Sequence, residues 1–277
     1  MGSNRLLRYS CYFIFFICYI FTVGTSLLHA QQDSIPVSAS SKLTADGKTI
    51  LSDAGTVILM PFHFGTKEWI NTGAVVGGMF LLMSVDQQGR DFAQRSQSGF
   101  NDRFFNATEQ YGVATYGVIG SIGLYAGGIA FGNNNIRETG LELIEALGFA
   151  GAATNVGKVL FARSRPYTGD GPHKFNFFRT NNDYLSFPSG HTVIAFTLSS
   201  TLSERIKNPY ATAVLYSAAG CTAYARMYHD QHWLSDAFAG AVLGTFMGVT
   251  VSHLHENSLQ SISLYPSPNG IGMAIQF

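Results

Sequence analysis

The chain has 277 residues, among them 17 lysines or arginines and 17 aspartates or glutamates, so its formal net charge is zero. This balance excludes the strong basic field expected of a nucleic-acid-binding protein. Charged residues make up 12% of the chain and hydrophobic residues 46%, whereas soluble domains average roughly a quarter charged residues. The composition therefore indicates one large domain associated with a membrane, and it implies neither a nucleic-acid nor a protein partner.

The amino terminus has the pattern of a secretory signal. Two arginines precede an apolar run over residues 11–23, and small residues follow up to Ala30. A basic start, an apolar middle and a small-residue end are typical of a segment that is removed on export. We expect residues 1–30 to be a signal peptide or, because Leu28 is large for its place before the cut, an uncleaved anchor.

The rest of the chain is predicted to be mostly helical. Residues 31–68 are rich in Ser, Thr, Asp and Gly and are expected to form a mobile mature amino terminus and a surface segment. The domain proper, residues 69–256, contains apolar or amphipathic stretches whose Gly and Ala content favours close helix packing. About six helices are expected, over residues 69–85, 112–132, 141–162, 191–206, 208–225 and 237–252.

Membrane crossing is harder to predict than helix formation. A spanning helix needs about twenty predominantly apolar residues, and only residues 112–132 reach that length comfortably. If all six helices crossed the membrane, the end of the third helix would face the cytoplasm. Six full spans and a periplasmic site near residues 158–165 are therefore incompatible.

The carboxyl terminus, residues 257–277, has a different pattern. Apolar residues alternate before and after a Pro-Ser-Pro-Asn-Gly sequence at residues 266–270, and Asn-Gly favours a tight hairpin turn. The predicted fold is therefore an all-α helical bundle of about six helices with a short C-terminal β-hairpin.

The first candidate site cluster closes the helix over residues 141–162. Lys158 and Arg165 are seven residues apart, so two helical turns place them on one face. Pro166 disfavours helical geometry at Arg165 and ends the helix there. A lysine point charge and an arginine fork together suit the oxygens of one phosphate, although a basic helix end that complements the helix dipole has the same appearance.

The second cluster opens the next helix. Ser189 is placed to cap that helix, and Gly190 allows its free N–H groups to approach an anion. His191 then lies in the first turn, where an imidazolium is unfavourable unless something negative is bound beside it. A simple capped helix start remains the alternative.

The third cluster precedes the last apolar helix. His232 and Asp236 are four residues apart and hence neighbours on a helical face, where a carboxylate can orient the imidazole and stabilise its cation. Arg226 precedes His232 by six residues and is placed to return to the same anion. A surface ion pair and a loop arginine would be the alternatives.

Other chemistries have weaker support. His229 and Asp230 lie beside His232, but a metal motif such as His-Glu-x-x-His is absent from the sequence. Cys221 is the only cysteine outside the signal segment, so no disulfide framework or cysteine metal site is expected. The prediction is a site without metal or cofactor.

Taken together, the three clusters resemble the three-part signature of the type 2 phosphatidic acid phosphatase superfamily, which also contains vanadium haloperoxidases and bacterial class A acid phosphatases. The motifs cover residues 158–236 and depart from the family pattern at Ala225, where serine is usual. The resemblance implies that His232 attacks phosphorus, that Asp236 orients it, and that His191 protonates the leaving oxygen and later activates water. It also implies five phosphate-binding residues: Lys158, Arg165, Ser189, Gly190 and Arg226.

The expected function is that of a bacterial, exported, membrane-associated phosphatase with its site facing the periplasm. Low charge favours phosphorylated lipids as substrates, such as phosphatidic acid, phosphatidylglycerol phosphate, prenyl pyrophosphate or lipid A phosphate. A soluble periplasmic acid phosphatase, a vanadium haloperoxidase and a noncatalytic lipid-binding protein are the alternatives.

Overall fold

The computed structural model describes residues 39–259, 262–267 and 270–275, with side chains from residue 40 to residue 256. The predicted signal segment lies outside the described residues. The described part contains nine α-helices instead of about six. They are α2 (Ala39–Leu59), α3 (Thr66–Ser84), α4 (Asp86–Arg95), α5 (Gly99–Thr108), α6 (Ala114–Ala130), α7 (Asn134–Phe161), α8 (Gly190–Ile206), α9 (Pro209–Tyr228) and α10 (Leu234–Leu259).

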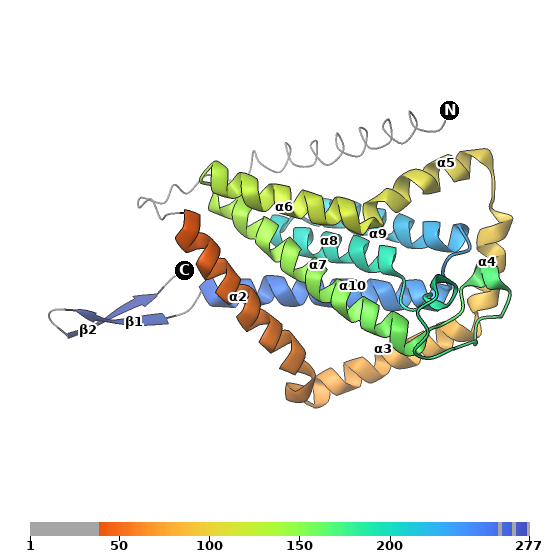
Figure 1. Cartoon of the computed structure of the whole chain (residues 1–277), viewed down its shortest axis with the longest axis horizontal. Helices are drawn as coiled ribbons and strands as arrows, with labels where there is room; N and C mark the ends of the chain where they lie inside the picture. Colours follow the sequence, from red (N-terminus) through yellow and green to blue (C-terminus); the bar gives the residue numbers. More distant parts are fainter. Residues whose placement is uncertain (1–38, 260–261, 268–269, 276–277) are drawn as a thin grey trace.

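Helices α6 to α10 form an antiparallel bundle, in which successive helices run back and forth along the long axis of the molecule (Figure 1). Helix α8 lies at its centre and packs on α7, α9 and α10. Apolar side chains of α7 and α8, among them Leu147, Ile194 and Leu198, form one buried cluster. As a result, the carboxyl end of α7 and the amino ends of α8 and α10 lie at the same end of the bundle (Figure 1).

Three glycines hold α10 against α8. A Cβ atom at Gly240 would lie 2.8 Å from the carbonyl oxygen of Ser189, and one at Gly244 would lie 2.4 Å from the carbonyl oxygen of Val193. At Gly248 it would meet the Ser200 hydroxyl. Only residues without a side chain permit this approach, so the sequence itself sets the short distance between the first turns of α8 and α10.

Three of the helices are not predicted from the sequence. Helix α2 occupies most of the stretch expected to be a mobile amino terminus and surface segment, and α4 and α5 fill the gap between the first two predicted helices. Helix α4 is polar, but its Asp86 is buried and paired with an arginine far along the chain. Helix α5 is capped by Ser98, whose side chain accepts a hydrogen bond from Asn101 N. Tertiary contacts and capping, not an apolar stripe, account for these helices.

The carboxyl terminus forms two antiparallel strands, β1 (Ile262–Ser267) and β2 (Gly270–Ile275). Their register pairs Ile262 with Ile275 and Ser267 with Gly270. The two strands project from the bundle beyond the end of α10 (Figure 1), at the place where the alternating pattern of the sequence occurs.

Helix α10 is the one helix among the described residues that is long and apolar enough by itself to cross a membrane, over Leu234–Glu256. Up to three spans are obtained if two bent pairs each count as one, namely Thr66–Ser84 with Asp86–Arg95 and Gly99–Gly112 with Ala114–Ala130. The expectation that residues 112–132 form the best single span is therefore wrong, because α6 covers only 17 residues and reaches span length only together with the helix before it.

Candidate active site

Lys158 lies in the last turn of α7, which ends at Ala162 in the left-handed conformation. Its ammonium group donates a hydrogen bond of 2.5 Å to the carbonyl oxygen of Leu185. A carbonyl carries no full charge, so this contact positions the lysine without neutralising it. Burial lowers the pKa of Lys158 to about 8, and the nearby positive charge of Arg165 acts in the same direction.

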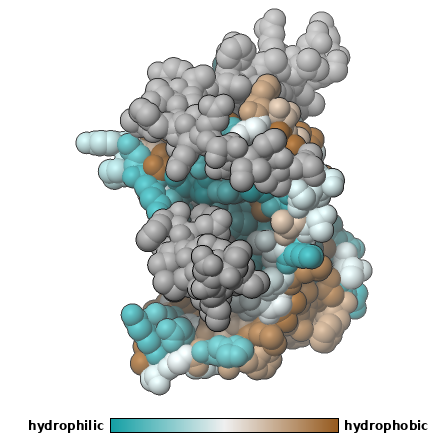
Figure 2. Space-filling view, turned by 90° about the vertical axis from the view of Figure 1, so that its left-hand side faces the viewer, coloured by the Kyte–Doolittle hydropathy of each residue, from teal (hydrophilic) through white to brown (hydrophobic). Residues whose placement is uncertain are grey.

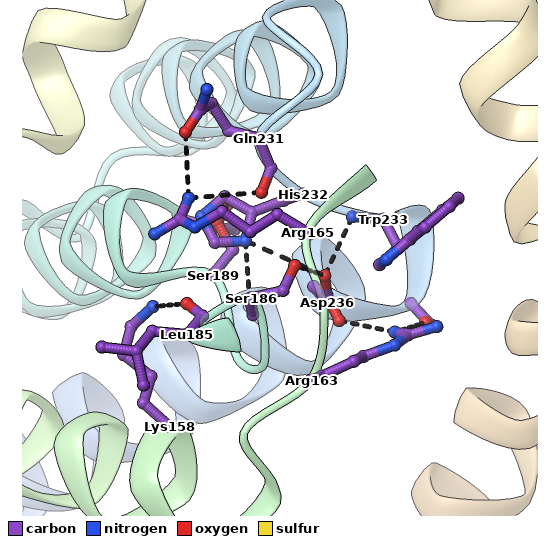
Figure 3. A network of polar contacts seen from close by, with 12 residues as sticks. Lys158, Arg163, Arg165, Leu185, Ser186, Ser189, Gln231, His232, Trp233 and Asp236 are labelled. Carbon is purple, nitrogen blue, oxygen red and sulfur yellow. Dashed lines mark hydrogen bonds and ion pairs between the residues drawn. The ribbon is translucent and has the colours of Figure 1, made fainter. Parts of the chain in front are cut away.

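Arg165 follows in extended geometry directly before Pro166, as the sequence predicts. Its guanidinium donates to the backbone and side-chain oxygens of Asn182 and to those of Gln231, at 2.8–3.3 Å. These four acceptors are amide oxygens, and none is a carboxylate. The arginine is thus held rigidly while its positive charge remains available to an anion (Figure 3).

Ser189 and Gly190 form the junction that opens α8. The Ser189 side chain does not cap the helix, which corrects the sequence expectation; it accepts a hydrogen bond of 2.9 Å from the Thr192 hydroxyl. Its backbone N–H donates to the carbonyl oxygen of Asp236 at 3.1 Å. A Cβ atom on Gly190 would lie 3.6 Å from Lys158 Cε, so the start of α8 faces the lysine directly.

His191 occupies the first turn of α8 and is partly buried. Burial lowers the pKa of its imidazole to about 3, and the positive charge of Arg226 adds to this effect. Lys158 and Arg165 act in the same direction. The histidine therefore lies within the electrostatic reach of all three predicted phosphate-binding cations.

His232 is almost completely buried, with 3% of its surface exposed. Its Nδ1 atom lies 2.7 Å from the carbonyl oxygen of Ser186 and 3.8 Å from Asp236 Oδ2. A carbonyl oxygen only accepts, so Nδ1 carries the proton and Nε2 carries the free electron pair. The main contact that orients this ring is thus the carbonyl oxygen of Ser186, and the carboxylate of Asp236 is the more distant of the two partners (Figure 3).

Burial lowers the pKa of His232 well below its ordinary value, although a hydrogen bond with Asp236 acts in the opposite direction. The charges of Lys158 and Arg165 lower it further. Both histidines of the site are thus surrounded by the same cations and stay neutral in the absence of an anion.

Asp236 lies at the centre of a buried network that the sequence does not predict in full. Its carboxylate accepts from Arg163 Nη1 at 2.6 Å, from the Ser186 hydroxyl at 2.5 Å and from Trp233 N at 2.9 Å. Arg163 is completely buried and bridges Asp236 to Asp86 of α4, to which it donates at 2.7 Å. Arg163 is present in the first sequence cluster, but its role as the partner of Asp236 depends on Asp86, 77 residues earlier in the chain.

Arg226 lies in the last turn of α9 and donates to Glu109 Oε2 at 2.7 Å. Burial lowers its pKa, and the neighbouring carboxylate raises it again. Its Nε atom is buried and has no hydrogen-bond partner among the described residues. Glu109 lies at the bend between α5 and α6, and no motif in the sequence marks it.

The structure brings together all eight residues predicted from the sequence, at the end of the bundle where α7 stops and α8 and α10 begin. The residues that reasoning from sequence misses are Arg163, Asp86, Ser186 and Glu109. Arg163 and Ser186 hydrogen-bond to Asp236, Glu109 hydrogen-bonds to Arg226, and Asp86 holds Arg163 in place.

The sequence also matches known proteins in this region. Residues 139–260 match the model of the PAP2 superfamily, and this segment contains every residue of the site described above except Asp86 and Glu109.

Three known proteins illustrate what this chain is similar to. A lipid A 1-phosphatase of Porphyromonas gingivalis is 33% identical over 108 residues, which are 38% of this chain and 21% of the relative, so the match spans about a fifth of that protein. A transmembrane PAP2-type phosphatidylglycerolphosphate phosphatase of Bacillus subtilis gives a TM-score of 0.52 at 18% identity, over 66% of this chain and 95% of that one. LpxE of Aquifex aeolicus gives 0.49 at 24% identity, over 60% and 94%. The B. subtilis structure shows that the helical PAP2 fold is shared.

Proposed function

We propose that the protein is a phosphatase that hydrolyses phosphorylated lipids through a phosphohistidine intermediate. The observation that carries the proposal is the common environment of the two histidines: Lys158 and Arg165 act on both His191 and His232. Cations that surround two neutral imidazoles form a site for an anion between them. The match of residues 139–260 to the PAP2 superfamily model supports phosphate as that anion.

In the first step, Nε2 of His232 attacks phosphorus while the bond between phosphorus and the leaving oxygen breaks. The Ser186 carbonyl supports this step because it fixes the Nδ1–H tautomer at 2.7 Å. As phosphorus is transferred, positive charge develops on the ring, and Asp236 at 3.8 Å stabilises it.

His191 donates a proton to the leaving oxygen in the first step. A phosphate bound between Lys158, Arg165 and Arg226 offsets the charges that lower the pKa of His191, so substrate binding raises this pKa and favours the protonated acid. In the second step His191 accepts a proton from water, whose oxygen attacks phosphorus and breaks the bond to His232. Inorganic phosphate then leaves, and both histidines return to their starting state.

The remaining groups hold the phosphate oxygens. Lys158, Arg165 and Arg226 supply positive charge, and the Ser189 hydroxyl and the Gly190 N–H supply hydrogen bonds at the start of α8. Positioning and electrostatics provide most of the catalysis in phosphoryl transfer. Since the side chains supply this charge themselves, the proposed mechanism requires no metal or cofactor.

A lipid substrate is supported by two observations. The matched relative from P. gingivalis is named a lipid A 1-phosphatase, and the bundle that carries the site includes α10, which is long and apolar enough to cross a membrane. We therefore place the protein in the membrane of the bacterial cell envelope with its site facing the periplasm, and we rank lipid A phosphates first among the candidate substrates.

The test is phosphate release by the purified full-length protein in detergent, measured with lipid A, phosphatidic acid, phosphatidylglycerol phosphate, prenyl pyrophosphate and a soluble aryl phosphate. Turnover is expected with at least one of the lipids, with inhibition by vanadate and no loss in EDTA. His232→Ala is expected to abolish turnover, while His253→Ala, which changes an exposed histidine of α10, is the matched control. Near-normal phosphate release by His232→Ala would overturn the mechanism, and activity on the soluble ester alone would overturn the lipid assignment.

A further inference from the structure

A second polar cluster lies away from the phosphate site. Asp53 of α2, Glu145 of α7 and His255 of α10 are buried and place one potential ligand atom each within 4.8 Å of the others. His255 Nε2 lies 2.9 Å from Glu145 Oε2 and 3.5 Å from Asp53 Oδ2. Glu145 precedes Lys158 by thirteen residues on the same helix, which corresponds to about 20 Å along α7. The cluster is therefore separate from the site proposed for phosphate.

Two carboxylate oxygens of this cluster lack a hydrogen-bond partner. Asp53 Oδ2 and Glu145 Oε1 are buried, and when both groups are ionised neither has a hydrogen-bond donor within the part of the chain that the structure describes. Only a proton shared between the two carboxyl groups would pair them. The Glu145 side chain has no exposed surface at all. A buried carboxylate oxygen is normally satisfied by a donor or by a metal ion, so two adjacent ionised carboxylates favour the binding of a cation.

The charges around the cluster lead to the same conclusion. The ion pairs at this end of the bundle join two arginines and one histidine to a larger number of carboxylates: Asp46, Asp53, Glu138, Glu142 and Glu145. The arginines, Arg137 and Arg205, are engaged by Asp46, Glu138 and Glu142. Among the groups in these ion pairs, the carboxylates exceed the cations by two even with His255 protonated. A divalent cation would balance this excess.

We propose that Asp53, Glu145 and His255 bind a divalent transition-metal cation of the zinc class. One imidazole nitrogen and two carboxylate oxygens form a mixed ligand set that suits such ions better than magnesium or calcium, which prefer oxygen alone. On binding, the cation takes the place of any proton on His255 Nε2 and bonds to the two unpaired oxygens.

The ion would have a structural role, because its three ligands come from three helices. Helix α2 stands at the side of the bundle (Figure 1) and reaches the core through Val57, beside Val193 and Met247. A metal ion held jointly by α2, α7 and α10 would fasten this outer helix to the bundle. The end of the molecule where α7 begins and α10 finishes presents both hydrophilic and hydrophobic residues to the surface (Figure 2).

The test uses tag-free, full-length protein in detergent, stripped with EDTA, desalted and titrated with Zn²⁺ by calorimetry. We expect one zinc ion per chain, with affinity at least tenfold weaker in Asp53→Asn, Glu145→Gln and His255→Gln. Glu256→Gln removes an exposed acid beside His255 that pairs with Lys207, and it should bind zinc like the wild type. At zinc concentrations a hundredfold above Kd, the wild-type Tm should rise by about 5 °C or more.

Several results would overturn the proposal. Absence of stoichiometric zinc binding by the wild type would overturn it, and so would zinc binding by all three ligand variants that equals that of the wild type. Equal binding of Mg²⁺ would exclude the transition-metal assignment. Each variant is first checked for native helical circular dichroism, and Asp53→Asn, on the outer helix, provides the readout if a change inside the bundle prevents folding. Because zinc binding is measured and not turnover, failure of this proposal and failure of the phosphatase proposal are distinguishable.

Discussion

Replacing Arg163 by methionine is expected to destabilise the protein and to slow turnover. The guanidinium donates to Asp86, Asp236 and the Ser235 hydroxyl at 2.6–2.7 Å and to the carbonyl oxygen of Pro172 at 2.9 Å. Methionine fills much of the same space but leaves two buried carboxylates without a countercharge. Removing one partner of a buried ion pair costs about 3–5 kcal/mol.

The lower end of that range is expected here, because both carboxylates keep other donors. Asp86 retains the backbone N–H and hydroxyl of Ser235, and Asp236 retains the Ser186 hydroxyl and Trp233 N. A loss of about 3 kcal/mol corresponds to a fall in Tm of about 6–12 °C for a domain of this size. Turnover measured well below the new Tm should fall as well, because Asp236 loses one of the donors that hold it beside His232.

The assay is thermal unfolding in detergent together with phosphate release at a temperature where the variant is folded. Arg95→Met, which changes an exposed arginine of α4, is the matched control and should alter stability by no more than about 0.5 kcal/mol. Arg163→Lys keeps one positive charge but loses the guanidinium fork that joins two carboxylates, so its Tm should lie between those of Arg163→Met and Arg95→Met. A Tm of Arg163→Met within 1 °C of the wild type would refute the assigned role of this network.

Three further predictions concern the phosphate site. Lys158, whose pKa is lowered to about 8, is charged below that pH and neutral above it. Inhibition by vanadate should therefore weaken as the pH rises through 8, and Lys158→Arg should move this loss of inhibition to higher pH. An unchanged pH profile in Lys158→Arg would contradict a role of Lys158 in anion binding. His191→Ala should slow turnover of an alkyl or lipid phosphate about 10²–10⁴-fold. It should slow turnover of a p-nitrophenyl ester much less, since that leaving group needs no proton. Equal losses on both substrates would argue against His191 as a general acid. Glu109→Ala removes the carboxylate that holds Arg226 in place at 2.7 Å. Because Arg226 is then no longer positioned to bind phosphate, steady-state kinetics should show KM raised about tenfold with a smaller change in kcat. A loss confined to kcat would assign Glu109 another role.

Much of the bundle is predictable because its helices follow from apolar stretches with clear ends. The expected helix over residues 191–206 differs from α8 by one residue at its start, and that over 208–225 falls short of α9 by three residues at its end. Glycine and proline punctuate these stretches, and local sequence is sufficient to place them. The same holds for the site, since Lys158, His191 and His232 lie at helix ends that the bundle then brings together.

The parts that escape prediction depend on distant partners. Helix α4 has no apolar stripe, and its buried Asp86 is stabilised by Arg163, which no local pattern connects to it. The role of Glu109 likewise depends on its ion pair with Arg226, 117 residues later in the chain. In both cases a charged residue that appears solvent-exposed in the sequence is partly or fully buried by a contact between separate helices, and neither composition nor periodicity reveals such a contact.

The hydrogen bond between His232 and the Ser186 carbonyl has a consequence for mutational scanning. The group that fixes the tautomer of the proposed nucleophile is part of the main chain, and every amino acid at position 186 supplies it. Changing the Ser186 side chain removes the hydroxyl that donates to Asp236 but leaves the carbonyl in place. A library of side-chain variants would therefore test the Ser186 hydroxyl but not the carbonyl that orients His232, and replacing the amide by an ester through chemical synthesis is the kind of change that reaches it.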